Sequence, residues 1–325
     1  MPLEIDGPSG GKRQNGAVVI GLINNMPDGA LRATESQFSS LLAEASGARS
    51  VRLRVSYLSG VPRDAEAKER LESTYWPLES LLADPPDAVI VTGAEPRSHE
   101  LEAEPYWPQL IALLDWTQAQ ATPSIWSCLA AHAAVLALDG IRRQRLTEKR
   151  FGVFTHRTSA SHPLLQGIGK SLLTPHSRWN ELPVAALQDA GYTLASLSEE
   201  AGADCFFRDG AGSLLCFQGH PEYEGTTLLL EYRRDVGRFL RGERDSWPAL
   251  PHGYFPPDAI AQVNRFRLRA EAAADPAFLS EFPTAELAAD LTPHWRPDAV
   301  RIYRNWLQQV TERKASTPTR LSMQV

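Results

Sequence analysis

Apolar positions in the first half of the chain form short continuous runs separated by stretches with helical spacing. The runs have the length and β-branched content of buried strands, and they cover residues 17–23, 51–58, 87–92 and 123–127. The stretches between them predict helices, one opening at residues 34–35, one over 106–120 and an Ala-rich one from residue 129. Strands that alternate with helices of this size predict an α/β fold, a mostly parallel sheet with helices on both faces.

The pattern changes after residue 151, where shorter strands and turns are predicted. The clearest strands cover residues 192–197, 204–208 and 214–218, and the RDGAG stretch at 208–212 predicts a hairpin turn. A helix over residues 226–240 follows. The strand ends of the first half and of this region are the places where a ligand site is expected.

Three segments are predicted. Residues 1–16, rich in Gly and polar residues, are interpreted as a flexible leader outside the fold. Residues 17–246 form the α/β catalytic domain. After a Pro-rich link, residues 247–325 carry two helical patterns, 259–274 and 299–310. Neither could bury its apolar face alone, so we expect a C-terminal helical extension packed on the core.

Composition narrows the class of protein. With 325 residues, 43% of them hydrophobic, the chain can bury a full core, and its net charge of -6 without a long run of like charges gives no sign of a nucleic-acid or membrane surface. No stretch reaches the roughly 18 apolar residues of a membrane span, and the N-terminus lacks the apolar part of a signal peptide. Three cysteines without paired spacing argue against disulfides and zinc. We expect a cytoplasmic protein acting on small molecules.

The first candidate for chemistry is Cys128, which stands where the strand at 123–127 meets the Ala-rich helix. The N-terminus of a helix favours a thiolate, and its backbone N–H groups can hold an oxyanion. The alternative is a buried structural cysteine, which behaves as a small hydrophobe. The junction makes the nucleophile as good an interpretation as the structural one.

The second candidate is the His220-Pro221-Glu222 run, which follows a strand that ends at Gly219. Two positions apart on extended backbone, the imidazole and the carboxylate point to one side, so Glu222 can orient His220 or stabilise its charged form. A turn with a surface carboxylate is the alternative. Together with Cys128, the pair matches the arrangement of class I glutamine amidotransferases, although these usually have small residues beside the cysteine, where this chain has Ser127 and Leu129.

Seven motifs occur in one order along residues 17–258: NNMP at 24–27, TESQF at 34–38, VTGA at 91–94, TEK at 147–149, PHSR at 175–178, GHPEY at 219–223 and RRDV at 233–236. Their order and spacing resemble the MetA-type homoserine O-acyltransferases, and a weaker match returns at residues 305–307. The resemblance implies a flavodoxin-like fold of the class I glutamine amidotransferase type. It also implies a place in methionine biosynthesis and commonly a homodimer.

The resemblance implies a role for each matching residue. Cys128 would accept an acyl group from acyl-CoA as a thioester, His220 would act as base on the hydroxyl of L-homoserine, and Glu222 would support it. The substrate site would be lined by Lys149, Ser177 and Arg234. Taken alone, such cations are more often solvated surface charges. Acyl-CoA is a co-substrate here, and neither a permanently bound cofactor nor a metal is expected.

Residue chemistry adds two expectations. Backbone N–H groups of Leu129 and of the loop around Ala94 are the candidates for an oxyanion hole. Arg97 falls on the position that the family links to acyl choice, where an Arg could pair with a succinyl carboxylate, so succinyl-CoA is favoured over acetyl-CoA. Arg97 pointing to solvent, or Glu95 or Glu100 taking over its position, are the alternatives.

Other functions also stay open at this point. L-serine could replace L-homoserine as acceptor, and a glutamine amidotransferase-type hydrolase is a second enzyme class. His132, one helical turn after Cys128, is interpreted as a core or helix-face residue.

Overall fold

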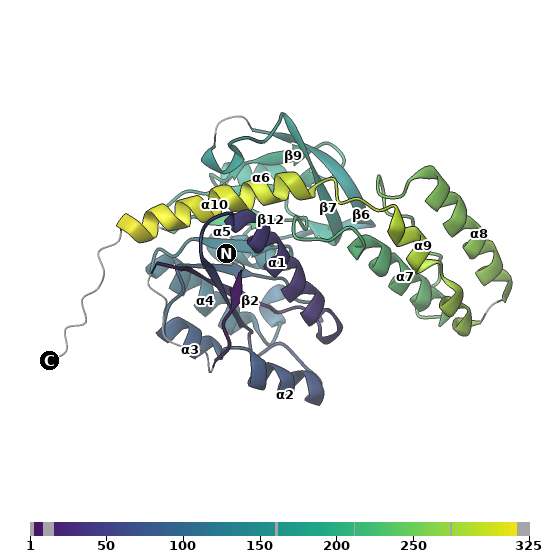
Figure 1. The fold of residues 1–325 in the computed structure, drawn as a ribbon, viewed down its shortest axis with the longest axis horizontal. Helices are drawn as coiled ribbons and strands as arrows, with labels where there is room; N and C mark the ends of the chain where they lie inside the picture. Colours follow the sequence, from purple (N-terminus) through teal and green to yellow (C-terminus); the bar gives the residue numbers. More distant parts are fainter. Residues whose placement is uncertain (1–2, 9–15, 160–161, 211, 274, 317–325) are drawn as a thin grey trace.

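The computed structural model describes residues 3–8, 16–159, 162–210, 212–273 and 275–316, and its centre is an eight-stranded sheet (Figure 1). The strand order is β1-β3-β2-β4-β5-β12-β11-β8; the strands are parallel as far as β12, and β11 is antiparallel to both of its neighbours, β12 and β8. In that order the strands are Glu4–Ile5, Val51–Ser56, Val18–Ile23, Ala88–Val91, Ser124–Ser127, Leu214–Phe217, Cys205–Arg208 and Thr193–Leu194. The predicted α/β fold with a mostly parallel sheet is confirmed.

Two hydrophobic clusters cover the two faces of this sheet. Side chains alternate along each strand, so that Ile20 and Leu22 of β2 join one cluster and Ile23 joins the other. The first cluster includes side chains from α1 (Leu31–Ser46), α2 (Ala65–Thr74) and the last helix, α10 (Arg296–Ser316). The second includes side chains from α3 (Leu78–Ala83), η2 (Leu101–Ala103), α4 (Trp107–Ala119), α5 (Leu129–Asp139) and α6 (Val184–Asp189).

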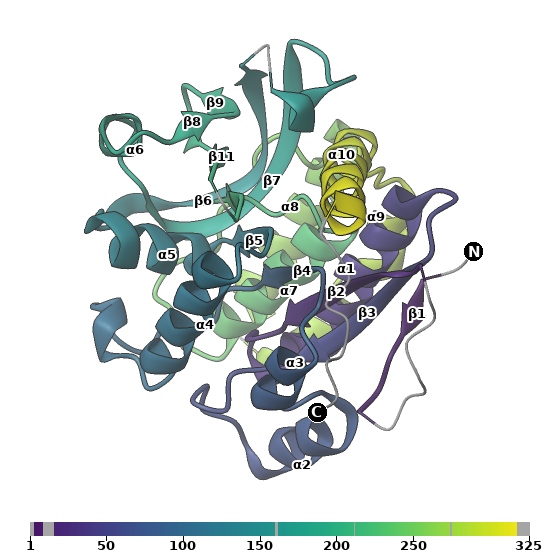
Figure 2. The same ribbon diagram turned by 90° about the vertical axis from the view of Figure 1, so that its left-hand side faces the viewer.

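A second sheet stands beside the first, as Figure 2 shows for β6 and β7. Its order is β10-β9-β6-β7, with β6 (Gln144–Thr158), β7 (Ser171–Glu181), β9 (Ser196–Ser198) and β10 (Gly202–Ala203). The short strands predicted at 204–208 and 214–218 are confirmed as β11 and β12 of the large sheet, but the long antiparallel pair of β6 and β7 was not predicted. The first half of β6 is largely exposed and carries four charged side chains in the stretch RLTEKR, which hides the strand pattern.

A third hydrophobic cluster joins helices from both sides of the predicted boundary at residues 246–247. It packs α7 (Thr227–Leu240) against α8 (Pro257–Ala273), η4 (Pro276–Glu281) and α9 (Thr284–Ala289), which lie together on the right of Figure 1. The last helix, α10, packs elsewhere and lies along α1 with Tyr303 and Trp306 in the first cluster. Within the described residues no helix is both long and apolar enough to cross a membrane.

The N-terminal segment takes part in the sheet, contrary to the prediction for residues 1–16. Strand β1 pairs with β3, and the buried Asp6 carboxylate lies 3.3 Å from Arg52 and 3.2 Å from Arg54 of that strand. Residues 9–15 of the predicted leader lie outside the described residues. A strand of two residues gives no periodic signal, and the sequence does not reveal the ion pairs that, together with the β1–β3 pairing, attach this segment to the fold.

Asp6 is therefore expected to contribute to stability. We expect Asp6→Ala to lower the free energy of unfolding by on the order of 3 kcal/mol, because it leaves two buried guanidinium groups short of a partner. Urea denaturation followed by circular dichroism measures this. The control is Glu4→Gln, at an exposed carboxylate that also pairs with Arg52, where we expect less than about 1 kcal/mol. Equal, small losses in both variants would contradict the interpretation.

Candidate active site

Cys128 occupies a strained turn between β5 and α5. Its backbone has φ 53° and ψ -115°, and among the described residues Ala121 is the other non-glycine residue with positive φ. Its N–H donates to the carbonyl of Phe217 at 2.7 Å, and the residue is partly exposed. Positive φ is costly for a side chain with a Cβ, so the surrounding structure holds this turn in place. The sulfur is thereby placed at the carboxyl edge of the sheet.

His220 and Glu222 form a buried hydrogen-bonded pair at the same edge. His220 Nδ1 lies 2.8 Å from Glu222 Oε1, and the two residues are only 6% and 4% exposed. Burial acts to lower the pKa of His220, but the charges of Glu222 and Cys128, and hydrogen bonds with both, raise that pKa well above its usual value. Cys128 is thus among the groups that act on the imidazole, although the two residues are far apart in the sequence.

Sheet topology explains this convergence. Strands β5 and β12 are parallel neighbours with Ser127 opposite Phe217, so the residues that follow the two strands emerge side by side. Cys128 follows β5 at once, and His220 comes three positions after the end of β12. Sequence analysis expected both residues at strand ends, and the structure brings them together.

Tyr223 connects the histidine to a second polar group. Its ring stacks on the ring of His220, with centroids 4.4 Å apart and an interplanar angle of 16°. Its hydroxyl donates to Glu231 Oε1 at 2.6 Å. Burial, and then the charge of Glu231, raise the pKa of Tyr223 well above its usual value, so the hydroxyl stays protonated and remains a donor.

The three predicted substrate-binding residues meet at Glu231, which sequence analysis did not single out. Lys149 Nζ of β6 lies 3.5 Å from Glu231 Oε2, the Ser177 hydroxyl of β7 donates to the same oxygen, and Arg234 of α7 lies 3.8 Å from it. We call Lys149, Ser177, Glu231, Arg234 and Asp235 the charged cluster. The signal that could have found Glu231 is its spacing of three positions from Arg234 on one helix.

Asp235 completes the charge balance of this cluster. It lies 3.2 Å from Lys149 and 3.3 Å from Arg234. Burial opposes ionisation, but these two cations, through charge and hydrogen bonds, lower the pKa of Asp235. Lys149 also lies 4.0 Å from the centre of the Phe151 ring. Two cations and two carboxylates thus stand together beside Tyr223, an arrangement that can exchange its internal ion pairs for those of a zwitterionic ligand.

The two predicted oxyanion segments are adjacent. A Cβ added to Gly93 would lie 3.1 Å from both N and Cβ of Leu129, so the loop passes directly beside the start of α5. Ala94 follows as a partly buried residue packed against the second hydrophobic cluster. Leu129 is the first residue of the helix, whose N–H has no intrahelical acceptor. The arrangement can direct N–H groups at an oxyanion formed beside Cys128.

Arg97 lies on the outer side of this loop. Its side chain is exposed, and its backbone N–H donates to Glu104 Oε1 at 2.6 Å. Burial acts to raise the pKa of Asp28, but Asp64 and Arg63 lower that pKa, and the charge of Arg97 adds a smaller effect in the same direction. The charge of Arg97 therefore acts on Asp28.

Arg143, which sequence analysis missed, is one of two arginines whose charge interacts with Cys128. The other, Arg178, is buried and already donates to the carbonyls of Asn180 and Ala201. Arg143 is partly buried and donates to the carbonyl of His99 at 3.0 Å. Burial lowers the pKa of Arg143, while Tyr106, Glu104 and Cys128 act to raise it. Arg143 follows a helix that ends at Asp139 and resembles any surface charge in the sequence, so only the folded structure brings it near the sulfur.

His132 has a core role, in line with its interpretation from sequence. It is buried and its Nε2 lies 3.0 Å from Gln218 Oε1. Burial lowers the pKa of His132 to about 3, so the ring is neutral near pH 7 and donates to the amide oxygen.

Comparison with known proteins identifies the family. A family model described as homoserine O-succinyltransferase matches residues 9–316. Homoserine O-succinyltransferases from Methylorubrum extorquens and Rhodopseudomonas palustris are each 45% identical to the chain, over 91% and 89% of it and over 88% and 87% of their own lengths. One from Bradyrhizobium japonicum is 40% identical over 92% of this chain and 93% of its own.

Solved structures agree on the fold. A glutamine amidotransferase from Methylobacillus flagellatus aligns with a TM-score of 0.54 at 16% identity, covering 91% of this chain and 95% of that one. Another from Thermotoga maritima aligns with a TM-score of 0.51 at 14% identity, covering 91% and 98%. At such identities the likeness shows a shared fold alone. The family match, its extent and the motifs it contains show that this chain belongs to the homoserine O-succinyltransferase family.

Proposed function

We propose that this protein transfers a succinyl group from succinyl-CoA to the hydroxyl of L-homoserine through a thioester on Cys128, a step of methionine biosynthesis. The observation that carries the proposal is the convergence of the sulfur, the His220–Glu222 pair and the charged cluster in a member of this family. Cys128, His220 and Glu222 are the catalytic residues of the proposal.

In the first half-reaction the Cys128 thiolate attacks the carbonyl carbon of the CoA thioester. The tetrahedral oxyanion is stabilised by N–H groups of Leu129 and of the loop at Ala94, and the CoA thiolate leaves with a proton from the His220 imidazolium. One thioester is exchanged for another, so the reaction needs little driving force. Stabilising the oxyanion is the main task of the protein.

In the second half-reaction the hydroxyl of the acceptor attacks the acyl-enzyme. A free hydroxyl is a poor nucleophile, so His220, now neutral, takes its proton as the new ester bond forms and the Cys128 thiolate leaves. The Glu222 carboxylate stabilises the imidazolium that results, as the third group of a triad does. Two half-reactions that share one covalent intermediate give ping-pong kinetics.

The charged cluster supplies groups for both ends of an amino acid. Arg234 offers a planar guanidinium and Lys149 an ammonium for the acceptor carboxylate, and Glu231 offers a carboxylate for its ammonium. The Ser177 hydroxyl stands beside Glu231 and can contact the acceptor backbone. The hydroxyl of Tyr223 donates to Glu231, and its ring stacks on His220. Tyr223 therefore keeps the acceptor site and the base at a fixed separation.

The covalent step is tested by intact mass. After mixing with succinyl-CoA without acceptor, we expect the protein to gain about 100 Da, the mass of a succinyl group replacing a proton, and to gain nothing in Cys128→Ala. Cys216→Ala is the control, because burial raises the pKa of that thiol far above neutrality. Adding L-homoserine should restore the original mass.

Other outcomes of this experiment identify other functions. An adduct of about 42 Da with acetyl-CoA, and none with succinyl-CoA, would make the protein an acetyltransferase. Clearance by L-serine but not by L-homoserine would change the acceptor. No adduct with either donor, together with release of ammonia from glutamine, would replace the proposal by amide hydrolysis.

The pH dependence of the second half-reaction tests Glu222. The acid limb of kcat/KM for homoserine reports loss of the neutral base below the pKa of His220, and Glu222 acts to raise that pKa. We expect Glu222→Gln to move the acid limb to lower pH and to reduce the plateau rate at least about 10-fold, since the base is weaker and less well oriented. An acid limb that stays in place would show that Glu222 does not act on His220 during transfer.

Donor selectivity tests two arginines. We propose that a cation pairs with the succinyl carboxylate, and the interaction between Arg143 and Cys128 favours Arg143 over Arg97 for this role. We expect Arg143→Ala to lower kcat/KM for succinyl-CoA by about 10- to 100-fold, the value of a charged hydrogen bond, with little change for acetyl-CoA. Arg97→Ala is the matched variant. A larger selective loss in Arg97→Ala would restore the sequence-based assignment.

A cytoplasmic location and a homodimer belong to the same proposal. The described cysteines, Cys128, Cys205 and Cys216, are unpaired, which is typical of a reducing compartment. Acyl-CoA remains a co-substrate in this scheme, and the transfer needs no bound cofactor, nucleic acid or membrane.

A further inference from the structure

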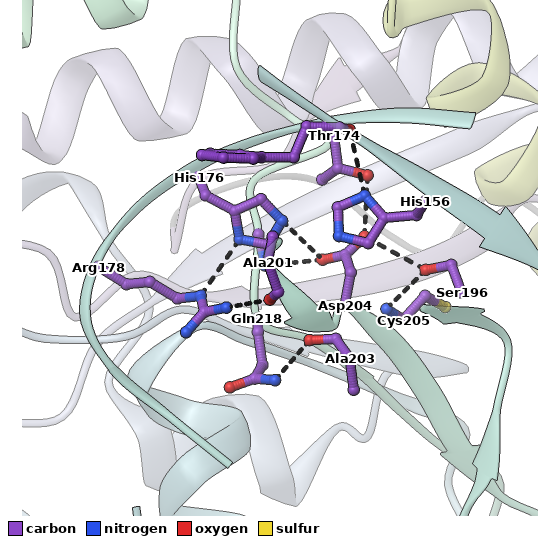
Figure 3. A network of polar contacts seen from close by, with 12 residues as sticks. His156, Thr174, His176, Arg178, Ser196, Ala201, Ala203, Asp204, Cys205 and Gln218 are labelled. Carbon is purple, nitrogen blue, oxygen red and sulfur yellow. Dashed lines mark hydrogen bonds and ion pairs between the residues drawn. The ribbon is translucent and has the colours of Figure 1, made fainter. Parts of the chain in front are cut away.

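Asp204 lies where the chain passes from the small sheet to the large one. It stands between the end of β10 at Ala203 and the start of β11 at Cys205, and it is 1% exposed. Its own N–H donates to the carbonyl of Ser196 in β9 at 3.1 Å. Figure 3 shows its side chain at the centre of a polar network drawn from both sheets.

Asp204 holds the segment that leads into His220. Three successive backbone N–H groups of this segment have acceptors: Gln218 N–H donates to the Asp204 carbonyl at 3.0 Å, Gly219 N–H to Asp204 Oδ1 at 2.8 Å, and His220 N–H to the Pro175 carbonyl at 2.8 Å. Two of the three acceptors belong to one residue. The direction in which His220 leaves the strand therefore depends on Asp204 and on β7.

The contact at Gly219 leaves no space for adjustment. A Cβ added there would lie 2.6 Å from Cγ2 of Thr174, 2.8 Å from Asp204 Oδ1 and 2.8 Å from the Pro175 carbonyl. All three atoms belong to backbone or to a side chain that is itself hydrogen-bonded. The backbone before His220 is thus pressed against Asp204, and a small change in the position of that carboxylate must move the imidazole.

The other carboxylate oxygen is also held. Thr174 donates its hydroxyl to Asp204 Oδ2 at 2.8 Å, and the Ser196 hydroxyl lies 3.5 Å from the same oxygen. His176 Nε2 lies 3.9 Å from Asp204 Oδ1. Side chains of β7 and β9 therefore hold the Asp204 carboxylate in the position from which it accepts the N–H of Gly219.

The same group of side chains is a candidate metal site by spacing, but its donor set does not fit. His156, His176 and Asp204 each place one ligand atom within 4.8 Å of the others. The Arg178 Nε–H donates to His176 Nδ1 at 3.2 Å, so the proton of this neutral ring is on Nε2, the atom that faces the cluster. A metal needs a lone pair from that atom. The group is suited to hydrogen bonding instead.

We propose that Asp204 is a positioning residue of the acyl transfer, which fixes His220 relative to Cys128 through its hydrogen bonds to the backbone of Gln218 and Gly219. Gln218 extends this control to the nucleophile helix, because its Oε1 accepts from His132 of α5 while its Nε2 donates to the Ala203 carbonyl. The inference rests on the proposed function, since it concerns how the base is held for that reaction.

Four variants separate the hydrogen bond from charge and from stability. Asp204→Ala removes the acceptor for Gly219. Asp204→Asn keeps it, because Oδ1 can still accept from Gly219 while the new amide donates to the Thr174 hydroxyl. Thr174→Val is the matched control, which removes a hydrogen bond from the same carboxylate but leaves the one to Gly219. Gly219→Ala displaces the segment with Asp204 intact, and it serves if Asp204→Ala does not fold.

We expect Asp204→Ala, or Gly219→Ala, to lower kcat by about 30- to 100-fold with KM for homoserine changed less than about 3-fold, because a catalytic group displaced by about 1 Å loses roughly that much rate without touching substrate. Asp204→Asn and Thr174→Val should stay within about 3-fold of wild type. The acid limb for homoserine should also move to lower pH in Asp204→Ala, since a displaced His220 loses the contacts that raise its pKa. Rates are normalised to the fraction of protein that stays folded.

Two results would overturn the inference. If Asp204→Ala shows wild-type kcat and acid limb per folded molecule and differs only in Tm, the residue is structural. If Asp204→Asn loses as much as Asp204→Ala, its charge and not its hydrogen bond to Gly219 matters. Failure of the proposed function looks different, because then wild-type protein itself forms no acyl adduct.

Discussion

The parallel pairing of β5 with β12 is the constraint on which the site depends. It places the residues that follow the two strands at one edge, and the hydrogen bond from Cys128 N–H to the Phe217 carbonyl ties the nucleophile to the strand that leads to the base. The positive φ of Cys128 is tolerated because this bond and the start of α5 hold the turn from both sides. Were β5 and β12 not neighbours, neither the sulfur nor the imidazole would have a partner, however well each local motif formed.

The second sheet brings part of the charged cluster to this edge. Its long strands β6 and β7 carry Lys149 and Ser177 to Glu231 of α7, while Pro175 of β7 accepts the N–H of His220. One strand thus supports both the acceptor site and the base. The third hydrophobic cluster, which packs α7 against α8 and α9, fixes the helix that carries the remaining charges. The helices after residue 247 therefore support the acceptor site from behind, without supplying any of its charges.

Local patterns in the sequence predicted the parallel sheet and the strand ends at which Cys128 and His220 lie. They did not predict the long-range polar contacts. Cys128 and His220 were found because each follows a buried strand, where composition and periodicity are clear. Glu231 was missed because a carboxylate on an amphipathic helix resembles a solvated charge until three partners from other elements are seen to meet it. Strand β6 was hidden by its charged first half, and β1 by its length of two residues. The buried partners of Asp6 and Asp204 have no signal in sequence spacing at all.

The shared fold with glutamine amidotransferases raises the question of why the acyl-enzyme would react with an amino acid instead of water. His220 and Glu222 are almost fully buried, which limits the water that can be activated. A water molecule also has no carboxylate or ammonium, so it gains nothing from Arg234, Lys149 and Glu231. An acceptor that binds these charges is held with its hydroxyl near the base. This orientation lowers its activation barrier relative to that of water, which binds without such orientation. Selection of the alcohol thus depends on a fixed distance between the charged cluster and His220. The stacked Tyr223, which bonds to Glu231, sets that distance on one side, and the backbone contacts of Asp204 set it on the other.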